Sequence, residues 1–102
     1  MEQPKNEISI ELNEQVAQGT YSNLAIITHS TSEFIVDFVR LMPGMPKAPV
    51  VSRVILTPEH AKRLLNALQD NVNKFEKNHG VIKVEVEMPP FPMNFGGNAA
   101  QA

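Results

Sequence analysis

The sequence contains no cysteine, so the chain can form no disulfide, no thiolate metal site and no cysteine nucleophile. It also has no apolar run near the ~18 residues that a membrane span needs. Its first residues, MEQPKNEISIEL, lack the apolar segment that follows the basic start of a signal peptide. Together these absences favour a cytoplasmic protein with no membrane partner.

The chain also lacks a charge excess of one sign. Nine lysines and arginines stand against eleven aspartates and glutamates, which gives a net charge of −2. Nucleic-acid-binding domains carry a basic face, whereas the basic residues here are spread along the chain. The balance therefore argues against nucleic acid as a partner. A length of 102 residues with 42% hydrophobic residues is typical of one small globular domain.

Alternating apolar residues predict several β-strands. Residues 8–12 read ISIEL, with Ile8, Ile10 and Leu12 on one side, which is typical of a half-buried strand at a sheet edge. The segments 21–30, 33–42 and 50–57 carry apolar residues on both sides. Residues 81–88 alternate again and form either a fifth strand or an extended tail.

A long amphipathic helix is predicted over residues 58–78. Thr57 is a good N-cap, Pro58 suits the first helical position, and Gly80 is a natural stop. The apolar residues recur at helical spacing and form one stripe: Ala61, Leu64, Leu65, Leu68, Val72 and Phe75.

These elements predict an α+β domain with a four-stranded antiparallel sheet, or a five-stranded one if residues 81–88 join it, and one long C-terminal helix packed on one face. Residues 1–7 form a loose N-terminus, residues 8–88 the single domain, and residues 89–102 a proline-rich, flexible tail. An antiparallel sheet with one solvated face should alternate apolar and polar residues. The two-sided strands therefore predict a cover for the second face.

Two candidates could cover the second face of the sheet. One is the C-terminal stretch MPPFPMNF, and the other is an identical subunit. We expect a homo-oligomer, most simply a two-fold dimer, because a large uncovered apolar face promotes association. The tail either docks into an apolar groove as a polyproline-like peptide or is a disordered terminus. The candidate interaction residues are Phe91, Met93 and Phe95 in the tail and Ile35 and Val39 in the sheet.

The titratable residues show no catalytic or metal-binding pattern. His29, His60 and His79 do not fall at ligand spacing, so no metal and no cofactor are predicted. Glu33 and Asp37 share a strand face but lie about 13 Å apart by strand rise, which is too far for a glycosidase pair. We therefore expect a non-enzymatic protein.

Asp37 lies among apolar neighbours on its strand and needs a cationic partner. Arg53 and Arg40 are the two candidates for a pair across the sheet. This pattern predicts a structural ion pair.

His60, Lys62 and Arg63 lie at the start of the predicted helix. A helix N-terminus favours anions, so these residues are candidates for a small anionic ligand site. However, no glycine-rich loop precedes the helix. The simpler interpretation is that the three side chains lie on the solvated face.

Three motifs resemble a family of small bacterial proteins known only as a domain of unknown function. They are G-x-Y-x-N, S-x-x-E-F-x-x-D-F and S-R-V-x-x-x-P-x-H-A-K-R-L-L-x-A-L. The matching residues are Gly19, Tyr21, Asn23, Ser30, Glu33, Phe34, Asp37, Phe38, Ser52, Arg53, Pro58, His60, Ala61, Lys62, Arg63, Leu64 and Leu65. The resemblance covers residues 8–82 and implies a bacterial source and a shared fold, but no activity.

The expected layout is also similar to that of the export chaperone SecB, which holds unfolded chains on apolar grooves. This likeness concerns the fold alone, and the chain lacks the second helix of SecB. With the two-sided strands and the tail, it leads us to expect an oligomeric protein-interaction or chaperone-like module. Binding of a small anionic ligand near His60 is the alternative.

Overall fold

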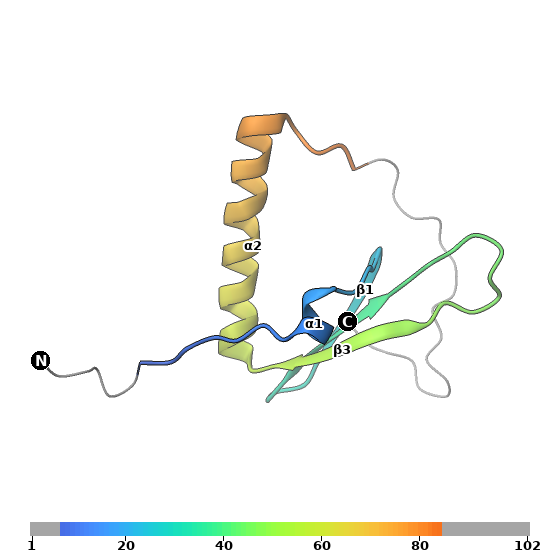
Figure 1. Ribbon diagram of the computed structural model, residues 1–102, viewed down its shortest axis with the longest axis horizontal. Coiled ribbons are helices and arrows are strands. Elements are labelled where there is room, and N and C mark those ends of the chain that lie inside the picture. Colours follow the sequence, from blue (N-terminus) through green and yellow to red (C-terminus); the bar gives the residue numbers. More distant parts are fainter. Residues whose placement is uncertain (1–6, 85–102) are drawn as a thin grey trace, which may run out of the picture.

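The computed structural model describes residues 7–84 and shows an α+β domain (Figure 1). Its elements in chain order are α1 (Glu14–Ala17), β1 (Leu24–His29), β2 (Phe34–Val39), β3 (Val50–Leu56) and α2 (Pro58–His79). The three strands form one antiparallel sheet in the order β1-β2-β3. The predicted class, an antiparallel sheet with a long C-terminal helix, is confirmed.

The turn of the β1–β2 hairpin is stabilised by the side chain of Ser30. Ser30 Oγ accepts hydrogen bonds from the backbone N–H groups of Ser32 at 3.1 Å and Glu33 at 3.2 Å. The N–H of Ser30 in turn donates to the Glu33 carbonyl at 2.9 Å. Serine is favoured in such turns because its hydroxyl replaces a backbone partner.

The other end of the hairpin is held by Asn23. Its side chain donates to the Leu41 carbonyl at 3.1 Å and accepts from the Leu41 N–H at 2.8 Å. Ser22 Oγ lies 3.0 Å from the carbonyl oxygens of both Leu24 and Val39, so its single O–H can donate to either of them. These bonds tie the chain entering β1 to the chain leaving β2, which gives Asn23 a structural role.

The central strand β2 holds the small core. Among residues 7–84 the buried side chains are Val36, Val39 and Asp37, at 8%, 3% and 2% exposure. Pairing places Ile27 and Val54 beside Val36 on one face. Cross-strand neighbours share a face in an antiparallel sheet, so the two-sided pattern of the strands produces an apolar row on each face.

Asp37 pairs with Arg53 rather than with Arg40. The guanidinium donates from Nε to Oδ1 at 2.6 Å and from Nη2 to Oδ2 at 2.9 Å. This fork geometry is the strongest form of such a pair. The hydrogen bond to Asp37, and then the charge of Asp37, raise the pKa of Arg53 above its usual value.

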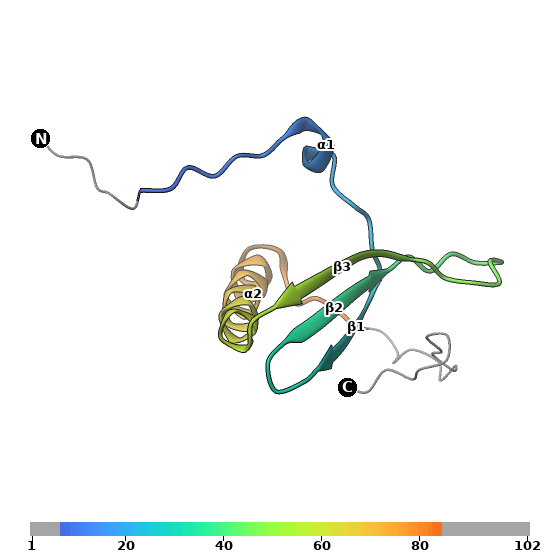
Figure 2. The ribbon, with the colours of Figure 1, turned by 90° about the horizontal axis from the view of Figure 1, so that it is seen from below.

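Helix α2 does not lie on a face of the sheet, which corrects the predicted packing. It rises from the end of β3 and leads away from the sheet, as Figures 1 and 2 show together. It packs chiefly against β3, and none of its residues is buried. Only Thr57 separates β3 from α2, so the strand end sets the helix direction.

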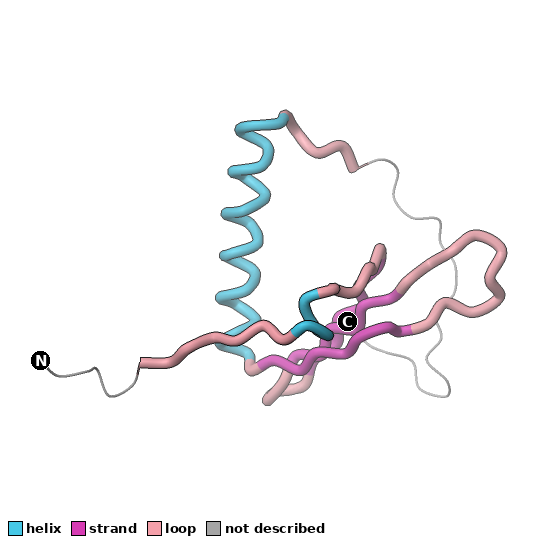
Figure 3. Tube along the Cα trace, viewed as in Figure 1, coloured by secondary structure: helices cyan, strands magenta, loops and turns pink. Residues whose placement is uncertain are grey.

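The predicted first strand is also not seen. Residues 7–12 form an extended segment, hereafter the N-terminal arm, which Figure 3 shows as loop. It is followed by α1, where Asn13 Oδ1 accepts from the Val16 N–H at 2.9 Å, and by Gly19 at φ 80°. These two features direct the arm away from the sheet (Figure 2). Residues 81–84 form no strand either, and residues 85–88 lie outside the described part.

Replacing Arg53 tests how the buried carboxylate is stabilised. Arg53→Met leaves the buried Asp37 without its partner, so we expect a lower urea midpoint, because an unpaired buried charge is strongly destabilising. Adding Asp37→Leu should restore most of the lost stability, since an apolar pair of similar volume replaces an ion pair well. Urea unfolding at fixed protein concentration measures both. A double variant no more stable than Arg53→Met would contradict this account.

Candidate functional site

Helix α2 presents an apolar stripe to solvent. The helix stripe is defined as Leu64, Leu65, Leu68 and Phe75, which are 43–63% exposed. Their spacing of 1, 3 and 7 residues keeps them on one side of the helix. A helix of this pattern normally buries its apolar side, so the stripe is a surface that a packing partner would cover.

The start and end of α2 are well defined, which keeps the stripe in one orientation. Thr57 Oγ1 accepts from the His60 N–H at 3.1 Å, and its carbonyl accepts from the Ala61 N–H at 2.9 Å. At the other end Gly80 has φ 97° and donates to the Glu76 carbonyl. Glu76 Oε2 also accepts from the Ile82 N–H at 2.9 Å.

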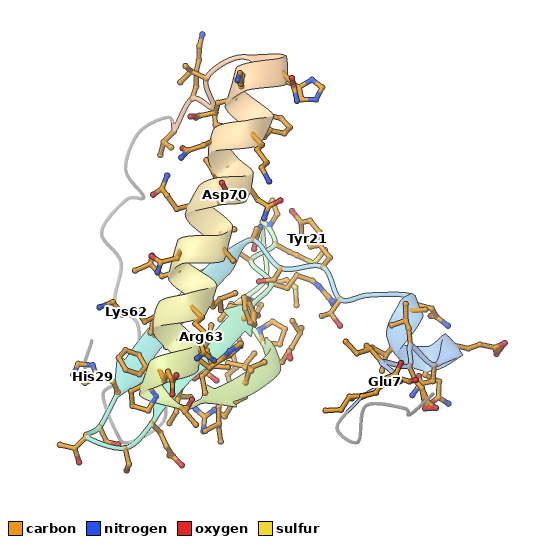
Figure 4. The ribbon with its side chains drawn as sticks, turned by 90° about the vertical axis from the view of Figure 1, so that its left-hand side faces the viewer. Glu7, Tyr21, His29, Lys62, Arg63 and Asp70 are labelled. Carbon is orange, nitrogen blue, oxygen red and sulfur yellow. The ribbon has the colours of Figure 1, made fainter. Side chains whose placement is uncertain are left out.

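The N-terminal arm is a second exposed apolar segment. Ile8, Ile10 and Leu12 are 70–94% exposed, and polar residues alternate with them. Figure 4 shows Glu7 well away from α2, so the arm and the helix stripe are separate surfaces. The alternation is that of a strand with one covered face.

One face of the sheet combines apolar side chains with an ion pair. This face carries Ile35 beside Ile55, with the Asp37–Arg53 pair next to them; we call it the Ile35 face. Ile35 is half-buried, whereas Ile55 is 57% exposed. Val39 lies on the same side but is buried. On this face the Asp37–Arg53 pair therefore lies between the Ile35–Ile55 pair and Val39 along β2.

The candidate interaction residues of the tail, Phe91, Met93 and Phe95, lie outside the described residues. Sequence reasoning named these and the sheet, but it missed the helix stripe and the arm as surfaces. The signal was present, because residues 8–12 and the helix each carry their apolar residues on one side, and such a side needs a packing partner.

The three residues of the candidate anion site lie on the helix without converging. Figure 4 labels Lys62 and Arg63 on the helix, where consecutive positions are rotated by about 100° from each other. Arg63 Nη2 is paired with Glu59 Oε2 at 2.5 Å. The His60 N–H is already used by the Thr57 cap. Anion binding near His60 therefore gains no support from this geometry.

The other two histidines contact aromatic rings. His29 stacks on Phe34 with ring centroids 5.3 Å apart, and His79 lies 4.8 Å from the Phe75 ring. Within the described range, no three metal-ligating side chains gather at one place. No helix in that range is both long and apolar enough to cross a membrane.

The described residues form a small α+β domain with a thin core and with exposed apolar side chains on the arm, on the helix and on the sheet. The chain belongs to the family described as Protein of unknown function (DUF3467), whose model matches residues 1–84. No curated protein and no solved structure matches it. The likeness to SecB thus stays a prediction.

The Thr57 cap provides a test of how the helix stripe is held. Thr57→Ala removes the acceptor for the His60 N–H, and we expect a loss of about 1 kcal/mol in the free energy of unfolding. Thr57→Ser keeps the hydroxyl and should stay close to the parent protein. Urea unfolding followed by circular dichroism at 222 nm measures both. Equal stability of the two variants would show that the cap is not used.

Proposed function

We propose that this protein is a non-enzymatic, homo-oligomeric module that binds polypeptide. The observation that carries the proposal is the helix stripe, four large apolar side chains on a 22-residue helix with no buried residue. Burying the exposed half of each would contribute about 1 kcal/mol per side chain. Helices of this kind gain most of their stability from packing, so a cover for the stripe stabilises the whole element.

A second copy of the chain is the cover we propose. Two copies related by a two-fold axis can place the same stripe against each other, because such an interface is self-complementary. The charged pair Asp70–Lys74, joined at 3.1 Å, lies on the side of α2 opposite to the stripe, because helical geometry rotates these positions by more than about 100° from its centre. Two identical stripes can therefore meet without bringing this charged pair into the buried centre of the interface.

The Ile35 face is the surface we assign to polypeptide. It offers an apolar strip, and the Arg53 guanidinium beside it is more than half exposed. Its guanidinium can donate to main-chain carbonyls of an extended segment, because Arg carries five N–H groups and only two contact Asp37. An extended, apolar-rich segment of another protein is the partner that suits this chemistry.

The self-association is tested with a charge placed in the helix stripe. The parent protein should elute with a light-scattering mass of at least twice 11.3 kDa. Leu68→Asp should shift the mass to that of one chain, because an unpaired carboxylate inside the interface costs several kcal/mol. Asn66→Asp places the same charge outside the stripe and should leave the mass unchanged. A light-scattering mass of one chain for the parent protein would contradict the proposal.

Polypeptide binding is tested with a chemically unfolded client protein. The parent protein should reduce light scattering from the aggregating client, and Ile55→Glu should lose this effect because it places a charge on the exposed apolar strip. Asn66→Glu carries the same charge on α2 and serves as the control. If the parent protein leaves aggregation unchanged, the polypeptide part of the proposal is wrong.

A further inference from the structure

We propose that the N-terminal arm of one copy adds as a strand to the free edge of β1 in a second copy. This inference rests on the self-association proposed above and names the element that is exchanged. It joins two features that the described residues leave without a partner: an arm with a strand pattern, and a sheet edge with no strand beside it.

The edge of β1 is unprotected. Natural edge strands are blocked by charged residues, prolines or bulges, because their free N–H and C=O groups pair readily with another chain. β1 reads LAIITH and contains no proline, lysine or acid. The other edge strand, β3, follows Pro49, carries Arg53 and has a register irregularity opposite Phe38 and Val39. Of the two edges, β1 is therefore the one open to pairing.

The arm matches this edge in length and pattern. Five residues in strand geometry span about 17 Å, close to the ~20 Å of the six-residue β1. In a strand, Ile8, Ile10 and Leu12 point to one side. Beside β1 they would cover the face that carries Ile27, which is 48% exposed.

Charge on the arm also suits an outermost strand. Glu7 and Glu11 alternate with the apolar residues, so they would lie on the new edge of the extended sheet. Charged residues on an edge prevent the addition of further strands. The exchange would then close the assembly rather than start a fibre.

The direction of the arm favours a second copy over the same chain. α1 and Gly19 separate the arm from β1, and the arm leads away from its own sheet (Figure 2). Under two-fold symmetry, each copy adds its arm to the sheet of the other copy and receives the arm of that copy in return. Both arms and both free edges become covered in one step.

The absence of cysteine permits a clean cross-linking test. Chains carrying Ile8→Cys, Ile10→Cys or Leu12→Cys are each mixed with chains carrying Ile27→Cys and oxidised mildly. At least one pair should give several-fold more arm-to-β1 disulfide between chains than Ser9→Cys or Glu11→Cys, which point to the opposite side. A disulfide needs Cβ atoms about 3.5–4.5 Å apart, so the product reports adjacency. Mass spectrometry of the linked peptides identifies it.

Three results would overturn the inference. One is equal cross-linking by both sides of the arm. The second is a predominant Ile27–Ile27 product, which would mean that two β1 strands pair with each other. The third is an intramolecular disulfide in a dilute chain carrying both Ile10→Cys and Ile27→Cys, because the arm would then lie on its own sheet. Light scattering on the same samples separates the two proposals: an oligomer without arm-to-β1 disulfide rejects the exchange alone, whereas a single-chain mass rejects the self-association.

Discussion

The described residues bury very little apolar surface, and the other features of the chain are best understood from this shortage. The sheet has three strands, and its core consists of Val36 and Val39 beside the paired Asp37. The helix that should cover the sheet leads away from it. A small domain needs most of its apolar side chains out of water to be stable. Residues 7–84 therefore leave apolar surface exposed that they do not cover themselves.

The elements themselves could be predicted from local signals. Alternation indicated the three strands because the side-chain period of a strand is two. The helix was predicted over residues 58–78 and spans Pro58–His79, because Thr57, Pro58 and Gly80 mark its ends. The Asp37–Arg53 pair was one of two alternatives, and the antiparallel register decides it by placing the two residues directly opposite each other.

The packing of these elements could not be predicted in the same way. An amphipathic helix shows that one side needs a cover, but the pattern does not say which surface provides it. The same holds for residues 8–12, which have a strand pattern but no neighbouring strand in this structure. A strand exists only as part of a ladder, so its presence depends on a partner edge. The surfaces on which the proposed function depends are thus the helix and the arm, for which the sequence pattern had predicted a partner within the same chain.

The central claim is that a second copy completes the fold, and the concentration dependence of unfolding tests it most directly. Association stabilises the folded state by mass action, so the urea midpoint of an obligate oligomer rises with protein concentration. We predict such a rise when the concentration is increased a hundredfold, with unfolding of α2 and of the sheet in one transition. A midpoint that does not change with concentration would contradict the account, because the single chain would then be stable by itself.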